Sequence, residues 1–207
     1  MVAHNAATES SKRWIERQLS DPYVRRAREA GYRSRAAFKL LEVCERSRVE
    51  LSGRHVVDLG CAPGGWLQVC VAAGAASVAG IDLLETEPLP GAHIVRGDIA
   101  SALDVAALKA GMPAPPDLVL SDMAANTTGH RQTDHLRTIA LVELALGFAE
   151  AELAAGGTFV SKVFQGGAVR SVLQRLKRQF AAVKHVKPPS SRASSPEVFV
   201  VAKGFRR

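Results

Sequence analysis

Short apolar segments alternate with helical segments along most of this chain of 207 residues. The apolar segments are rich in β-branched residues, and glycine or proline stands at nearly every junction. This alternation predicts an α/β fold, in which helices cover both faces of a doubly wound, mostly parallel sheet. Only PPSSRASS separates the last two apolar segments, too little for a helical crossover, so we expect an antiparallel strand at one edge. The expected strands lie at residues 54–60, 77–83, 93–98, 116–123, 158–164, 182–188 and 197–205.

The length of the chain suits one domain with a single hydrophobic core. Residues 1–10 are small and polar, and we expect them to form a disordered tail. Residues 11–207 are expected to form one domain, which opens with a basic helical extension over about residues 11–50.

The composition argues against a membrane anchor, a disulfide and a metal site. Three glutamates interrupt the most apolar helical segment, residues 139–160, which does not suit a membrane span. The three cysteines form no C-x-x-C pair, and no histidine stands at metal-ligand spacing. We therefore expect a cytoplasmic protein with neither a metal ion nor a membrane as partner. Separately, we expect a monomer.

The positive charge of the chain is concentrated at its two ends. The net charge is +7, but residues 1–54 carry +5, residues 55–161 carry −8 and residues 162–207 carry +10. One interpretation is an ordinary solvated surface; the other is that both ends meet and bind the phosphates of RNA. Few aromatic side chains are available for stacking, so we expect recognition of RNA shape and phosphates. The expected phosphate contacts are Arg33, Arg35, Lys184, Lys187 and Arg192.

A glycine-rich turn follows the first expected strand in the segment VVDLGCAPGGW. Gly60, Gly64 and Gly65 allow the backbone to approach a ligand closely, and Trp66 stands at the start of the next helix. The spacing G-x-x-x-G-G differs from the dinucleotide pattern G-x-G-x-x-G, and Pro63 removes one N–H donor. Dinucleotide binding is therefore the weaker interpretation.

Three aspartates, Asp82, Asp98 and Asp122, end the three expected strands that follow. Taken alone, each one could simply cap a helix at a strand–helix turn. Together with the glycine turn, they favour a cationic adenosine derivative whose ribose hydroxyls can donate to carboxylates. S-adenosylmethionine is such a ligand, so the sequence predicts a Rossmann-like methyltransferase domain with this cofactor.

A lysine, Lys162, lies inside the apolar segment GGTFVSKVFQGG. Burying an ammonium group is costly unless the group is paired or loses its proton. The simplest alternative is that the side chain leaves the end of the strand and reaches solvent.

Several of these segments are similar to the bacterial FtsJ/RlmE family of ribosomal RNA 2′-O-methyltransferases. The similar segments are DLGCAPGGW, SDMAAN, SKVFQG and SSRASSPEVFVVAKGF, and the resemblance covers the chain from about residue 11 onward. One departure is Ala125, where the family commonly has proline; we expect a slightly looser loop that still binds the cofactor. The resemblance implies a uridine in the A-loop of large-subunit ribosomal RNA as substrate, within an assembled subunit.

The resemblance also implies a catalytic tetrad, formed here by Lys39, Asp122, Lys162 and Glu197. A ribose 2′-hydroxyl needs alignment with the methyl group and a general base to accept its proton. A lysine can be that base when burial and a neighbouring cation favour its neutral form. We expect Lys162 to be the base, Asp122 to orient it, and Lys39 and Glu197 to position the ribose. Taken singly, Lys39 would be a surface residue and Glu197 could pair with Arg192.

Two other classes of function remain open at this point. A non-catalytic, RNA-binding ribosome-assembly factor could keep the fold, although such a protein would be expected to have lost part of the tetrad. A small-molecule methyltransferase would share the cofactor site, but it would leave the basic C-terminal part unexplained.

Overall fold

The computed structural model describes residues 21–125, 130–164, 170–193 and 195–207. The expected tail at residues 1–10 and the first part of the helical extension, residues 11–20, lie outside these ranges. The strands are β1 His55–Leu59, β2 Ser77–Asp82, β3 Ala92–Arg96, β4 Leu118–Ser121, β5 Thr158–Phe164, β6 Phe180–Val186 and β7 Glu197–Phe205. The helices are α2 Pro22–Glu29, α3 Ala36–Ser47, α4 Gly65–Ala72, α5 Ala102–Ala110, α6 Arg131–Glu152 and α7 Arg170–Gln179.

All seven strands form one sheet in the order β3-β2-β1-β4-β5-β7-β6, which confirms the predicted α/β class. Strands β1 to β5 pair in parallel, and β7 pairs antiparallel with both β5 and β6. The last two strands, β6 and β7, are antiparallel neighbours as expected. The strand that runs against the others is β7, and it lies between β5 and β6, whereas we had expected it at the edge of the sheet. Helix α7 is a crossover that makes β6 parallel to β5, and the short return then places β7 between them.

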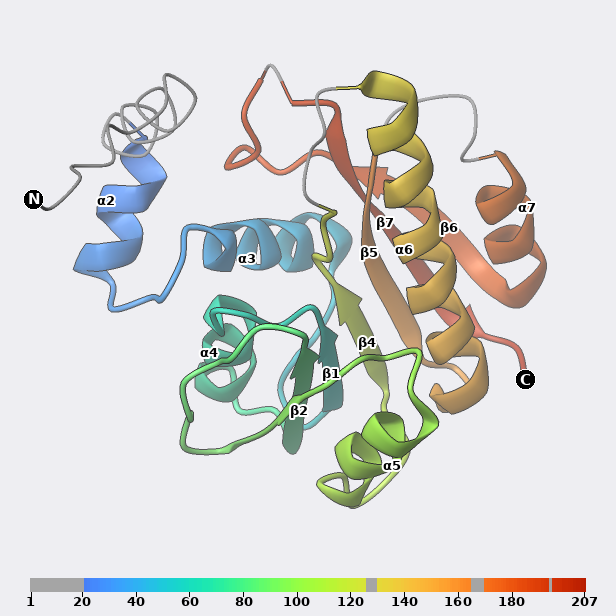
Figure 1. Ribbon diagram of the computed structural model, residues 1–207, viewed down its shortest axis with the longest axis horizontal. Helices are drawn as coiled ribbons and strands as arrows, with labels where there is room; N and C mark the ends of the chain where they lie inside the picture. The colour runs from blue at the N-terminus through green and yellow to red at the C-terminus, as the bar shows by residue number, and fades with distance from the viewer. Residues whose placement is uncertain (1–20, 126–129, 165–169, 194) are drawn as a thin grey trace, which may run out of the picture.

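Helices cover the sheet on both faces (Figure 1). Helices α5, α6 and α7 pack on one face, and α3 and α4 pack on the other. On the face covered by α5, α6 and α7, the hydrophobic core ends beside β6 in packed aromatic rings. The ring centroids of Phe180 and Phe205 lie 5.2 Å apart there. No helix of the described ranges combines the length and the apolar character needed to cross a bilayer.

The described part of the expected N-terminal extension forms two helices, α2 and α3. Helix α2 stands out from the body of the domain, whereas α3 lies against the sheet (Figure 1). The chain turns between them at Gly31, whose φ of 74° belongs to the left-handed region that favours glycine. At the far end of α3, the Lys203 ammonium donates to the carbonyls of Ser47 and Arg48 at 2.6 and 2.7 Å. These bonds satisfy carbonyl groups that a helix leaves free at its end.

The strand register gathers the sequence-predicted site residues at one edge of the sheet. Ser121 of β4 is the register partner of Ser161 of β5, so the next residues, Asp122 and Lys162, are neighbours. Because β7 runs antiparallel to β5, its first residue, Glu197, lies at the same edge as the carboxyl ends of the parallel strands. This edge is where open α/β sheets bind ligands.

Trp66 links the glycine-turn helix α4 to the N-terminal helix α3. The side chain is 3% exposed, and its indole N–H donates to the carbonyl of Ala36 at 2.7 Å. Its ring also packs against Phe199 of β7, with 5.7 Å between the centroids. Trp66, predicted as a cofactor contact, is therefore placed in the core that holds α3 and α4 together.

Replacing this side chain should destabilise the whole domain. We expect Trp66→Ala to lower the free energy of unfolding by about 3–5 kcal/mol, because a large buried side chain leaves a cavity. Urea denaturation followed by circular dichroism measures the change. Leu103→Ala is the control, because Leu103 is an exposed residue of α5. A loss below about 1 kcal/mol in the Trp66 variant would contradict the proposed packing role.

Candidate active site

Lys162 is buried and paired. Its side chain is 6% exposed, its Nζ lies 3.0 Å from Oδ1 of Asp122, and it donates to the Asp122 carbonyl at 2.8 Å. The ammonium group therefore faces Asp122 and does not reach solvent, so the alternative of an escaping side chain is wrong. A carboxylate and a carbonyl together replace the water that the ammonium group loses.

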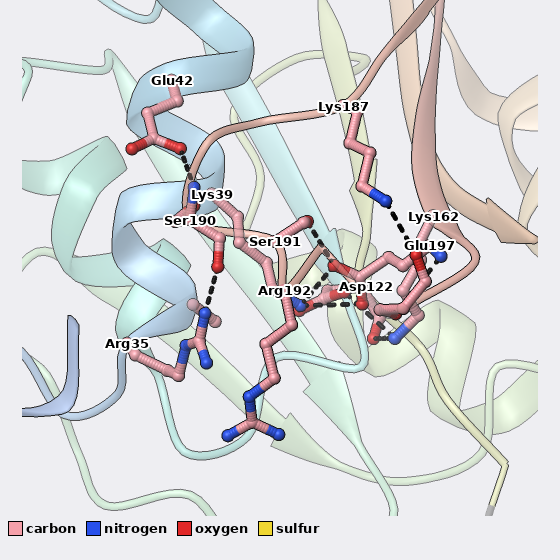
Figure 2. Close-up of polar contacts among 12 residues, drawn as sticks. Arg35, Lys39, Glu42, Asp122, Lys162, Lys187, Ser190, Ser191, Arg192 and Glu197 are labelled. Carbon is pink, nitrogen blue, oxygen red and sulfur yellow. Dashed lines mark hydrogen bonds and ion pairs between the residues drawn. The ribbon is translucent and has the colours of Figure 1, made fainter. Parts of the chain in front are cut away.

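Lys39 and Glu197 complete a row of alternating charges (Figure 2). Lys39 extends from α3, and its Nζ lies 2.9 Å from the Glu197 carboxylate and 3.6 Å from Oδ2 of Asp122. The structure thus brings together all four residues of the predicted tetrad. Lys39 is only 14% exposed at its side chain, so it is not the surface residue that the helix alone would suggest.

The Glu197 carboxylate has a second partner that the sequence did not single out. The hydroxyl of Ser191 donates to Oε1 of Glu197 at 2.7 Å, and the backbone N–H of Glu197 donates to Ser195 at 3.2 Å. Arg192, the alternative partner of Glu197, instead donates to the carboxylate of Asp21 at 3.1 Å. The run of serines just before Glu197 was the available signal for these contacts.

Two cavities flank the four charges. One, of about 290 Å³, is lined by Gly60, Ala62, Ile81, Asp82, Leu83, Leu84, Gly97, Asp98, Ile99, Asp122, Met123, Ala124, Leu141 and Leu144. The other, of about 340 Å³, is lined by Ser34, Arg35, Ala36, Lys39, Ala62, Pro63, Ser191, Arg192, Ser195 and Glu197. Ala62 lines both, and the tetrad contributes Asp122 to the first cavity and Lys39 and Glu197 to the second. Lys162 lines neither cavity, and its Nζ lies 3.0 Å from Asp122, which lines the first.

The side chains of the first cavity suit an adenosine ligand that itself carries a positively charged group. Carboxylates at three strand ends stand among apolar side chains, which suits ribose hydroxyls and a cationic group next to a flat base. Asp82 also holds the glycine turn, because it accepts the N–H groups of Ala62 and Leu84 at 2.9 and 2.8 Å. The alternative role as a helix cap does not apply to Asp98, since Ser101 caps α5.

The glycines of the turn are required by close contacts within the protein. Gly64 has a φ of 106°, and a Cβ there would lie 2.6 Å from Nη1 of Arg33. A Cβ on Gly60 would lie 2.5 Å from Cγ of Met123. The sequence predicted that these glycines let the backbone approach a ligand. In the structure they let it approach the side chains of Arg33 and Met123.

Arg33 ties the glycine turn to the connection between β2 and β3. Its guanidinium group donates to the carbonyls of Pro63, Glu87 and Pro88 at 3.2, 2.7 and 2.8 Å. The connection also contains Leu83 and Leu84 of the first cavity. These contacts favour a role in holding that cavity over the predicted contact with RNA phosphate.

Three more of the predicted phosphate contacts are also bound within the protein. Arg35 and Lys187 donate to backbone carbonyls in the connection between β6 and β7. Arg35 and Arg192 both bind the carboxylate of Asp21. Lys184 is exposed on the edge strand β6. Sequence reasoning placed these cations near the site but did not anticipate that most of them organise its loops.

Asp58 is a buried carboxyl that sequence reasoning missed. It lies in β1, is 1% exposed, and neither of its side-chain oxygens has a hydrogen-bond partner. Burial raises the pKa of the Asp58 carboxyl well above its usual value, and the nearby charges of Asp122 and Asp82 add to the increase. The available signal was the same as for Lys162, namely a charged residue inside an apolar strand.

Within the described ranges, no three side chains of metal-ligating type lie together.

A sequence profile of FtsJ-like methyltransferases matches residues 32–205 of the chain. The chain belongs to the FtsJ-like methyltransferase family. It is 62% identical over 207 residues to ribosomal RNA large subunit methyltransferase E of Hyphomonas neptunium, covering 100% of this chain and 88% of that protein. It is 57% identical over 198 residues to the protein of the same name from Sphingopyxis alaskensis, covering 95% and 86%.

The fold is shared with a solved structure from Plasmodium falciparum, of a protein assigned as a ribosomal RNA methyltransferase. The TM-score is 0.73 at 30% identity, over 84% of this chain and 98% of that one. As a methyltransferase, the FtsJ-like chain uses S-adenosylmethionine, and the acids and apolar residues of the first cavity fit that group.

Loss of the Arg33 bridge should weaken cofactor binding. We expect Arg33→Ala to raise the Kd for S-adenosylmethionine about tenfold, since three hydrogen bonds that fix the cavity loops are lost. Isothermal titration calorimetry measures this without RNA, and Arg28→Ala on the exposed side of α2 is the control. An unchanged Kd together with weaker RNA binding would instead identify Arg33 as a phosphate contact.

The buried Asp58 should make stability depend on pH. The folded protein holds this proton more tightly than the unfolded chain, so the contribution of Asp58 to stability falls as pH rises above about 4. We expect Asp58→Asn to leave Tm nearly unchanged close to that pH and to raise it by about 2–6 °C at pH 8. Thermal melting without cofactor tests this, with the exposed Glu45→Gln as control. A difference that does not grow with pH would contradict the raised pKa.

Proposed function

We propose that the FtsJ-like chain methylates a ribose 2′-hydroxyl of large-subunit ribosomal RNA, with Lys162 as the general base. The observation that carries this proposal is the row of four charges in contact, of which Asp122 lines the adenosine-like cavity and Lys39 and Glu197 line the second cavity. A nucleoside in the second cavity would present its sugar to Lys39 and Glu197, on the side that faces Asp122 and Lys162.

The cofactor would be held by the glycine turn and by Asp82, Asp98 and Asp122, and when bound it supplies an electrophilic methyl group. The residues of the chain then have to align the hydroxyl and receive its proton. We assign the proton to Nζ of Lys162, which is buried and lies 3.0 Å from Oδ1 of Asp122; the ammonium group first releases its own proton to solvent, and the resulting amine then accepts the proton of the hydroxyl. The carboxylate of Asp122, 3.0 Å away, stabilises the ammonium group that results from the transfer.

The remaining two residues position the nucleophile. The ammonium group of Lys39 is held between the carboxylates of Asp122 and Glu197. Its remaining N–H can therefore donate to the ribose while the side chain keeps its position. Glu197 is held by Lys39 and Ser191, which leaves a fixed acceptor at the rim of the second cavity. Positioning of this kind can supply a large part of a rate enhancement.

The relatives support ribosomal RNA as the substrate class, because the two described above are named as methyltransferases of the large subunit. The concentration of positive charge in residues 162–207 also suits a polyanion. We extend the proposal to a uridine of the A-loop in the assembled subunit, and to the cytoplasm, where ribosomes are modified.

The test is methyl transfer by the wild type and by Lys162→Ala. We expect the variant to lose about 10²–10⁴-fold in kcat, because a general base contributes about that much, while its Kd for cofactor changes by less than about threefold. Tritiated S-adenosylmethionine and large subunits lacking the modification provide the assay, and nuclease digestion identifies the labelled nucleoside. Lys109→Ala on α5 is the matched control, since Lys109 pairs with Glu152 and lies outside both cavities.

Three outcomes would count against the proposal. Equal rates for Lys162→Ala and wild type would exclude the lysine base, and label on a base would exclude the ribose target. Label in neither protein, despite salt-dependent binding to subunits, would favour the non-catalytic assembly factor.

A further inference from the structure

The tip of the connection between β6 and β7 is clamped by α3. The Ser190 side chain is 1% exposed, and its backbone N–H donates to Oε2 of Glu42 at 2.7 Å. The carbonyl of the same residue accepts a bond from the guanidinium group of Arg35. Both backbone groups of one buried residue are thus satisfied by side chains from α3 and its N-cap residue, Arg35, and leaving either group without a partner would be costly.

The residue after this clamp holds Glu197. Ser191 is 6% exposed, and its hydroxyl donates to Oε1 of Glu197 at 2.7 Å. A hydroxyl proton on a carboxylate fixes the rotation of the carboxyl group as well as its place. The position of the Ser190 backbone therefore sets the direction from which Ser191 reaches Glu197.

Helix α3 carries these contacts on one face. Arg35, Lys39 and Glu42 follow each other at spacings of four and three residues, so they point to the same side of the helix. Lys39 binds Glu197 directly, and the other two bind the segment that leads to it (Figure 2). The hydroxyl of Tyr23 donates to the other oxygen of Glu42 at 3.3 Å, so the Glu42 carboxylate is itself held.

We propose that Glu42 is a positioning residue, which acts through the Ser190 backbone and Ser191 to orient the Glu197 carboxylate for the reaction. Because Glu42 and Lys39 belong to the same rigid helix, the clamp fixes the distance and the angle between Lys39 and Glu197 together. Glu42 touches neither cavity, so its effect is on the geometry of Glu197 and not on binding of the cofactor. The proposal rests on the proposed function.

The test compares Glu42→Ala with Glu42→Gln in the methyl-transfer assay described above. We expect Glu42→Ala to lower kcat about tenfold and to change both the KM and the Kd for S-adenosylmethionine by less than about twofold. In Glu42→Gln, the amide oxygen still accepts from Ser190 and the amide nitrogen can donate to Tyr23, so kcat should recover to within about threefold of the wild type. Glu45→Ala is the control, because Glu45 is exposed on the same helix.

A second variant covers the case in which Glu42→Ala does not fold. Ser191→Ala removes the hydroxyl that donates to Glu197 and leaves the backbone clamp on Ser190 in place, and we expect it to lower kcat about fivefold in a variant that still folds. Ser191→Thr should restore the rate, since it keeps the hydroxyl. A wild-type rate in Ser191→Ala, or a fall in cofactor affinity in place of kcat, would overturn the positioning role. No transfer by the wild type would overturn the proposed function, and the positioning role with it.

Discussion

The site depends on how the buried Lys162 ammonium group is compensated. An ammonium group in an apolar strand would be strongly destabilising without partners, and here Asp122 supplies both a carboxylate and a carbonyl. The aspartate in turn faces Lys39, which faces Glu197, so positive and negative groups alternate and the row is neutral overall. Removing one member would leave a neighbour buried without its counterion, which is a larger cost than the bond itself. Four elements, α3, β4, β5 and β7, are therefore bound to one another by their charges as well as by their packing.

Much of the fold was predictable from the sequence, because apolar segments bounded by glycine and proline have few ways to be arranged. The final strand was predicted with the bounds that the structure shows, Glu197–Phe205. The position of β7 between β5 and β6 was not predictable from the sequence pattern. The short connection indicates that β7 pairs antiparallel with β6, but it does not indicate which strand lies on the other side of β7. The N-terminal extension was read as helical throughout; in the described part, Gly31 marks the turn that separates α2 from α3. Such boundaries depend on packing, which periodicity does not record.

The four members of the predicted tetrad came from the family resemblance. The strand register explains why Asp122, Lys162 and Glu197 meet, and Lys39 reaches them from α3. The surrounding shell was harder to predict, since composition gives the number of cations and not their partners. Arg33 and Arg35 were expected to meet phosphate, and in the structure their donors are directed to carbonyls and to a carboxylate of the protein itself. A guanidinium group can serve either purpose, because its planar donors bind carboxylate and carbonyl oxygens as well as phosphate oxygens. Whether an arginine binds the protein or a phosphate therefore depends on where the loops place their carbonyl groups, which the sequence does not give.

Strand β7 is the last strand to be synthesised, and it runs antiparallel to both of its neighbours in the sheet. During synthesis β5 and β6 are both complete before β7 exists, yet β6 joins the sheet only through β7. Until then β5 presents an open edge and β6 has no strand to pair with. Glu197 arrives with this same strand, after Lys39, Asp122 and Lys162 have been made. The step that closes the sheet is thus also the step that completes the charges, and a chain interrupted before β7 would lack both.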